Sequence, residues 1–271
     1  MNAGGTSAAL PAARRRWALG SEVRLALGAI VLIAGLAGCV TRPTASPAPE
    51  QAPVARAAPS PHLGQPFEVL PRDSLLVVLV YRAGALAAFG HDHIVACRCI
   101  SGKLYVPGDP AQASFDLRIP VGQLTVDDPT VRAAEHSADF PADVSQSAQQ
   151  AVRHNMLTPA VLDAAQYPDI VLRAEGLRHA SSGKPGDIIA RVLVQLRGQS
   201  RSIAVPVHYD LRADEVVASG EFPLEQTALG LTPFSTLGGA LSVRNSMTVR
   251  FRLVARSSQL CTGRSCARGA P

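Results

Sequence analysis

The sequence predicts an all-β domain with a small helical insert, in which eight strands close into an antiparallel barrel. Segments of strand length, either alternating or continuously apolar, follow one another between residues 74 and 255. Turn-forming residues separate most of these segments, which is typical of strands connected by hairpins. Closing so many strands into a barrel removes the edges that an open sheet would leave unpaired. A β-sandwich is the alternative that the pattern leaves open.

The expected strands differ in how clearly they alternate. Ser74–Tyr81 is a continuous run of β-branched and Leu residues, whereas Ala113–Pro120 places apolar and polar side chains on opposite faces. Gly198-Gln199 predicts a two-residue hairpin between two later strands. A barrel of this size encloses side chains or one small or elongated ligand. The eight expected strands are Ser74–Tyr81, Ile94–Val106, Ala113–Pro120, Ile170–Leu177, Ile188–Arg197, Ser200–Leu211, Glu215–Pro223 and Ser242–Ala255.

One segment has helical rather than strand character. Ser145–Leu162 is broken at Pro159, and Thr158 is placed to cap a short second helix that starts at this proline. We therefore expect a helical insert between the third and fourth strands.

The first 38 residues have the features of an export signal. Four arginines, the last of them Arg24, precede an uncharged run from Leu25 to Gly38. This run is shorter than the ~20 residues that a bilayer-spanning helix needs, but it suits the apolar part of a signal peptide. We therefore exclude residues 1–38 from the fold.

The end of this run resembles the lipobox of bacterial lipoproteins, in Leu36-Ala37-Gly38-Cys39. That resemblance implies cleavage before Cys39 and lipidation of this cysteine, so the chain would be held at a membrane by acyl chains. Val40 stands where lipoproteins of the inner membrane usually carry Asp, which implies the outer membrane, facing the periplasm. An ordinary cysteine after an uncleaved signal anchor is the alternative.

Composition divides the rest of the chain into three parts. Residues 39–66 are rich in Pro and Ala without hydrophobic periodicity, which predicts a disordered tether. Residues 67–256 have the length of one domain, and residues 257–271 form a flexible tail that contains cysteines. The formal charge of +5 owes much to the arginines of the leader, and no basic run interleaved with aromatics follows. We therefore expect no nucleic-acid partner.

The domain carries five motifs in a fixed order: Phe89–His93, Leu162–Pro168, Leu193–Ser200, Leu229–Leu231 and Ser246–Phe251. In their order and spacing they resemble the YceI-like family, also called polyisoprenoid-binding or lipocalin-like proteins. The resemblance implies an eight-stranded lipocalin-like barrel whose apolar lumen takes an isoprenoid chain, such as a polyprenyl or quinone tail. It spans roughly residues 72–255, although the polar stretch before the helical insert is longer here and aromatic residues are few.

Residues that line the lumen can be proposed only in part. In the first strand Leu76 and Val78 alternate with Leu75 and Val77, and because both faces are apolar, periodicity does not say which face points inward. Aromatic rings would add contact area for a ligand, although each could equally belong to the core. The candidate ligand-binding residues are Phe89, His91, His93, Phe115, Phe222, Phe234 and Phe251.

The segment His91-Asp92-His93 carries the most conspicuous chemistry. Histidines at i and i+2 of a strand face the same side and have a spacing that can chelate a metal ion, with His136 and His154 as distant partners. The interpretation that we prefer is structural: both rings hydrogen-bond to backbone at the barrel mouth, and Asp92 sets their tautomer. Asp127-Asp128 is expected in a solvated loop.

Four cysteines besides the lipidated one are candidates for disulfides in an oxidising compartment: Cys97, Cys99, Cys261 and Cys266. Cys97 and Cys99 are expected to be poorly placed to bond each other, since they lie at i and i+2 of one strand. Cys261 could pair with Cys266, or both could pair with the first two and tie the tail to the second strand. A metal or redox site that combines Cys97 and Cys99 with the two histidines is the further alternative.

These observations favour a non-enzymatic binding protein. The motifs Gly-x-Ser-x-Gly and His-Glu-x-x-His are absent, and no paired carboxylates stand out. We expect an isoprenoid-type lipid as the ligand, and no cofactor. Two alternatives stay open: a metal- or haem-linked envelope stress protein that uses His91 and His93, and a structural envelope lipoprotein whose barrel is filled with side chains.

Overall fold

The computed structural model describes residues 62–141 and 144–257. The expected export signal, the lipidated Cys39, most of the tether, and the tail with Cys261 and Cys266 lie outside the described residues. Within the described ranges, no helix is long and apolar enough to cross a membrane.

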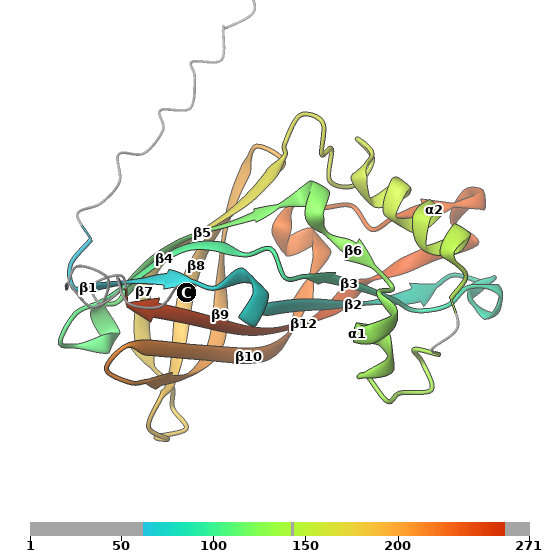
Figure 1. Cartoon of the computed structure of the whole chain (residues 1–271). Coiled ribbons are helices and arrows are strands. Elements are labelled where there is room, and N and C mark those ends of the chain that lie inside the picture. The colour runs from blue at the N-terminus through green and yellow to red at the C-terminus, as the bar shows by residue number, and fades with distance from the viewer. Residues whose placement is uncertain (1–61, 142–143, 258–271) are drawn as a thin grey trace, which may run out of the picture. The chain divides into compact units, whose positions relative to one another are not determined.

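Eight strands close into an antiparallel barrel, as the sequence predicted, so the sandwich alternative is wrong (Figure 1). The last strand pairs back with the first, with Phe67 opposite Ser257, and this pairing closes the sheet. In spatial order the barrel strands are β1 (Gln65–Val69), β4 (Ser101–Val106), β5 (Ser114–Pro120), β7 (Asp169–His179), β8 (Asp187–Leu196), β9 (Gln199–Leu211), β10 (Glu215–Glu225) and β12 (Leu241–Ser257).

Three further strands extend the sheet beyond the barrel: β2 (Leu75–Ala83), β3 (His93–Cys97) and β6 (Thr125–Val126). They form what we call the β2–β3–β6 extension. It exists because β12 is long: its last three residues, from Ala255 to Ser257, pair with β1, and the stretch from Ser242 to Arg252 pairs with β2. Figure 1 shows β2 and β3 continuing past the barrel beside two helices, of which α1 (Pro129–Ala133) contacts β3 and α2 (Gln146–Leu157) contacts β6.

The remaining elements are short. Strand β11 (Ser235–Thr236) pairs with β12. The 3-10 turns are η1 (Pro71–Asp73), η2 (Ala87–Phe89), η3 (Pro110–Gln112), η4 (Val121–Gln123), η5 (Gln226–Leu229) and η6 (Leu237–Gly239).

The two faces of β2 are buried in two different apolar clusters. Leu76 packs against the main cluster inside the barrel, while Val77 and Leu79 pack with Ile94 and Phe140 on the opposite face. This arrangement explains why the first expected strand is apolar on both sides. Burial of both faces removes the alternation on which an assignment from sequence depends.

Several boundaries differ from those expected. Strand β1 lies where the tether was expected to end, and the predicted strand Ile94–Val106 is two strands, β3 and β4, which pair with different partners. The helix ends at Leu157, and Thr158 is its C-cap rather than the N-cap of a second helix. The Thr158 hydroxyl donates to the Asn155 carbonyl, so it provides a hydrogen-bond donor for a carbonyl in the last turn of α2.

The predicted hairpin between β8 and β9 is confirmed, with its turn one residue earlier than expected. Leu196 pairs with Gln199, so Arg197 and Gly198 form the turn. Both turn residues have positive φ (51° and 69°), as a type I′ turn requires at its two central positions. Glycine meets that requirement without strain, whereas Arg197 does so at some cost.

Candidate functional site

The barrel lumen is the larger of two places where predicted site residues gather. It holds a cavity of about 270 Å³, and the described side chains that line it include only two with polar groups, Ser114 and Tyr209, and none with a charge. Phe115, Phe222 and Phe251 line it, as expected from the sequence. An interior of this kind offers contact area to an alkyl chain, but only two hydroxyl groups and no charge to a polar headgroup.

The other candidate ligand contacts lie elsewhere. Phe89 is 86% exposed on η2, and the partly exposed Phe234 precedes β11; neither lines the lumen. His93 is the first residue of β3 in the extension, His91 lies two residues before this strand, and both are also absent from the lumen lining. The structure therefore divides the predicted set into a group inside the barrel and a separate histidine site.

The barrel wall is incomplete between β9 and β10. These strands pair only near their hairpin, from Val216 opposite Leu211 to Ser219 opposite His208. Beyond that point, at Gly220, the Pro206 carbonyl of β9 and the ring of Phe251 occupy the space that a side chain would need: a Cβ there would lie 2.4 Å from the Pro206 oxygen and 2.7 Å from Phe251 Cε1. Phe251 thus covers a part of the wall that no backbone hydrogen bonds close.

A groove of about 690 Å³ runs along the outside of the same strands. Its lining includes charged side chains such as Glu221 and Arg250. Three apolar residues, Ile188, Val207 and Phe251, line both this groove and the lumen. The outer groove and the inner cavity therefore adjoin where β9 and β10 separate.

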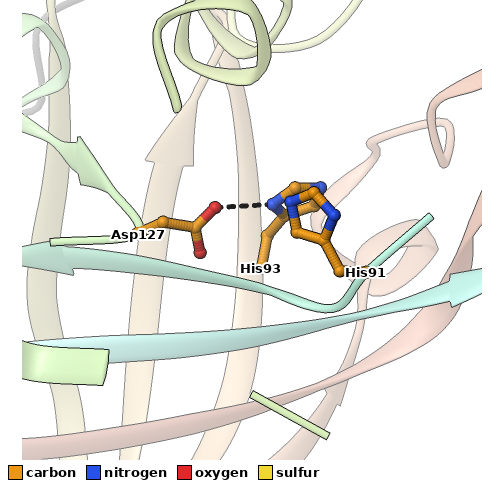
Figure 2. A group of neighbouring side chains, drawn as sticks. All are labelled: His91, His93 and Asp127. Carbon is orange, nitrogen blue, oxygen red and sulfur yellow. Dashed lines mark hydrogen bonds and ion pairs between the residues drawn. The ribbon is translucent and has the colours of Figure 1, made fainter. Parts of the chain in front are cut away.

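The second site brings together His91, His93 and Asp127, which lies directly after β6 (Figure 2). One ring nitrogen from each histidine and one Asp127 oxygen all lie within 4.8 Å of one another. The two rings meet edge to face, with centroids 4.6 Å apart and planes at 61°. His93 Nδ1 lies 2.7 Å from Asp127 Oδ2, in hydrogen-bonding contact.

Asp127 is fully buried, which corrects the expectation of a solvated loop. Its Oδ1 accepts from the Ile94 backbone N–H at 2.9 Å and from the Arg132 guanidinium at 2.5 Å. Its own N–H donates to the Ile94 carbonyl at 2.7 Å, and its φ of 53° turns the chain here, at the end of a strand. Only Asp128 behaves as a surface residue, since its carboxylate caps α1.

Arg132 is the ion-pair partner of Asp127, and the sequence did not indicate it. Its side chain is buried beneath α1 and donates to the Pro141 and Asp92 carbonyls as well as to Asp127. The Asp128-Pro129 pair, an N-cap followed by proline at the first helical position, could have predicted the helix. No pattern in the sequence marks Arg132 as buried.

Asp92 does not set the histidine tautomers, contrary to the preferred interpretation. Its carboxylate accepts from the Arg82 backbone N–H at 2.8 Å and pairs with the Arg82 guanidinium at 3.5 Å. The orienting carboxylate is Asp127, 34 residues beyond His93 in sequence. His136 and His154 are exposed and belong to no group with His91 and His93 in the described structure.

Burial and charge shift the ionisation of this site. Burial alone would raise the pKa of Asp127, but hydrogen bonds from His93 and Ile94 and the charge of Arg132 outweigh it, and the pKa falls below its usual value. Burial lowers the pKa of His91, and the neighbouring His93 lowers it further. Two buried nitrogens, His91 Nε2 and Arg132 Nη2, have no hydrogen-bond partner among the described residues.

Cys97 and Cys99 form a disulfide with each other, which corrects the expectation that they could not. Residues i and i+2 of an extended strand are about 6.6 Å apart. Here β3 ends at Cys97 and the chain bends, so the two Cα atoms approach to 5.2 Å, within the range of ordinary disulfides. In this disulfide neither sulfur is a thiolate, so neither can act as a metal ligand together with the histidines.

The chain is similar to several known proteins. The solved structures to which it is similar include Burkholderia cenocepacia BcnA (15% identity, TM-score 0.49, covering 69% of this chain and 98% of that one). A polyisoprenoid binding domain from Saccharophagus degradans is also similar (11% identity, TM-score 0.45, covering 72% and 99%). No curated protein matches the sequence. The model of the YceI-like domain matches residues 93–255, more than half of the chain, and the protein therefore belongs to the YceI-like family.

Proposed function

We propose that this protein is a non-enzymatic carrier that binds the apolar tail of an isoprenoid-type lipid, such as a polyprenyl or quinone tail, in its barrel lumen. The observation that carries the proposal is the lining of the lumen, in which no charged side chain is found among the described residues. Burying apolar surface contributes roughly 25 cal/mol per Å² without requiring directional contacts. Selectivity would therefore depend on the length and width of the tail.

The size of the cavity limits how much of a lipid fits inside. Its volume of about 270 Å³ lies just below the ~300–1,000 Å³ of typical ligand pockets. A long prenyl tail would therefore enter only in part. The rest would leave the lumen beside Phe251, which lines both the cavity and the outer groove. Rotation of this ring would join the two spaces, with the headgroup in the groove among polar side chains.

We further propose that the domain is held at the outer membrane, facing the periplasm, through acyl chains on Cys39. This part rests on the lipobox-like sequence and on the Pro- and Ala-rich segment that follows it. A membrane anchor would keep the carrier beside the lipids from which its ligand comes.

The test is recovery of the lipid from protein purified out of its own envelope. Organic extraction and mass spectrometry should detect a prenyl lipid in the wild type and much less in Ala218→Phe, because Ala218 lines the lumen. Ala204→Phe is the matched control: it adds the same ring on the same part of the barrel, at an exposed position of β9. Equal recovery from Ala218→Phe and Ala204→Phe, or none from the wild type, would overturn the proposal.

The small volume of the cavity also favours a second candidate, a structural envelope lipoprotein whose barrel is filled by its own side chains. The two candidates differ in how the lumen tolerates added volume. A closely packed core loses about 1–3 kcal/mol of stability when methylenes are added, whereas a ligand-binding cavity accepts them.

A further inference from the structure

We propose that His91 and His93 bind a single transition-metal ion of the kind that prefers imidazole, such as Zn²⁺, Cu²⁺ or Ni²⁺. The site would be separate from the lumen, because neither histidine lines the cavity. It therefore does not depend on the lipid-binding proposal.

The first observation is the distance between the donor atoms. One ring nitrogen of each histidine lies within 4.8 Å of the other, and the rings are in edge-to-face contact. Bonds from a metal ion to imidazole nitrogen are about 2.0–2.1 Å long, so two nitrogens on one ion lie up to about 4 Å apart. Small rotations of the two rings are enough to place both nitrogens on the same ion.

The second observation is the orientation of His93. Its Nδ1 faces Asp127 Oδ2 at 2.7 Å, and a proton on Nδ1 leaves the lone pair of Nε2 free for a ligand (Figure 2). A carboxylate that holds a histidine from behind in this way is the usual arrangement around metal-bound histidines. Asp127 is itself held by Ile94 and Arg132, so it serves as a positioning residue rather than a ligand.

The third observation is an unpaired atom. His91 Nε2 is buried and has no hydrogen-bond partner in the part of the chain that the structure describes. Buried nitrogens without partners are rare in proteins, and a bound ion is one of the partners that such atoms have. A metal ion shared with His93 would satisfy this atom.

The charges around the pair select the type of ion. The buried Asp127 is compensated by the buried Arg132, so the two histidines offer neutral nitrogen ligands without a free carboxylate. Hard ions such as Mg²⁺ and Ca²⁺ prefer oxygen ligands, whereas imidazole suits Zn²⁺, Cu²⁺ and Ni²⁺. Cys97, at the other end of β3, is joined to Cys99 in a disulfide, so neither supplies a thiolate. Solvent or an exogenous ligand would complete the coordination.

The experiment is a titration of untagged, chelator-treated protein with Zn²⁺, followed by calorimetry. We expect one ion per chain, and at least tenfold weaker binding in His91→Ala and in His93→Ala. His208→Ala is the matched control, because it removes a ring from an exposed His–Asp pair and should leave the affinity unchanged. Asp127→Asn should weaken binding by about 10–100-fold while keeping the stoichiometry.

A second measurement is independent of whether these variants fold. In nitrogen-edited NMR spectra of the wild type, Zn²⁺ should shift the ring nitrogens of His91 and His93 and leave those of the other five histidines in place. The proposal is wrong if the variant lacking both histidines binds Zn²⁺ as tightly as the wild type, or if the shifts fall on other histidines.

Discussion

Asp127 accepts a hydrogen bond from His93 on one oxygen and ion-pairs with Arg132 through the other, and both Asp127 and Arg132 are buried. One carboxylate thus links the histidine site on β3 to helix α1. The Asp127–Arg132 pair lies beside the apolar cluster of Ile94 and Phe140, where a single uncompensated charge would be costly. This relationship leads to the first prediction.

Arg132→Met should destabilise the domain strongly, because it leaves the Asp127 carboxylate buried without its cation. Removing one partner of a buried pair typically costs about 3–5 kcal/mol. Asp127→Asn combined with Arg132→Met should recover part of this loss, since neither charge then remains. The free energies of unfolding in urea measure both effects.

The control for this prediction is a surface pair. Arg118, whose side chain is 62% exposed, contacts Asp169 at 3.1 Å. Arg118→Met should change the free energy of unfolding by no more than about 1 kcal/mol. If Arg132→Met changed the free energy of unfolding as little as Arg118→Met, the buried pair would contribute little to stability. The inference that Arg132 holds the Asp127 carboxylate in place for His93 would then be wrong.

Ala218→Phe should leave the stability of the domain nearly unchanged if the lumen is a ligand cavity, because the ring would occupy existing space. In a filled barrel the same change would cost about 1–3 kcal/mol through overpacking. Thermal and urea unfolding of delipidated protein distinguish the two candidates. Ala204→Phe, on the exposed side of β9, reports any effect of the ring that is unrelated to the lumen.

Gly220→Ala should destabilise the barrel by about 1–3 kcal/mol, although it adds only one methyl group. A Cβ at Gly220 would collide with the Phe251 ring and with the Pro206 carbonyl. Gly122→Ala is the matched control, since a Cβ there meets no atom within 4 Å. Phe251→Ala should rescue only part of the loss, because the backbone of Pro206 remains; full rescue would mean that the ring alone closes this gap.

Asp187 should titrate below its usual range, because hydrogen bonds from His208 and then Ser182 lower the pKa of its carboxyl. The unfolded chain takes up a proton near pH 3.8 while the folded chain does not. This contribution to stability is therefore present above pH 3.8 and is lost as the pH falls through the lowered pKa. Carboxyl NMR titration should show the pKa rising in His208→Ala and rising less in Ser182→Ala; no change in either variant would contradict the assignment.

The sequence by itself determined the architecture of the barrel. Strand-length apolar segments separated by turns appear as strands, because their backbone pairing and burial agree with local preference. The hairpin at Gly198 was predicted to within one residue, since positive φ at consecutive positions favours few residue types. The ordered motifs indicated the YceI-like family because each is a short run of residues that can be identified in the sequence without knowledge of the fold.

Only the tertiary structure decided which side chains face the lumen and which charges are buried. Leu76 and Val77 are equally apolar, and their sides are assigned by what packs against each face of β2. The sequence predicts Asp127 as a loop residue beside Asp128. It is buried instead, because Arg132 on α1 and His93 on β3 both hydrogen-bond to its carboxylate. These contacts join segments far apart in the chain, so no local pattern of residues encodes them.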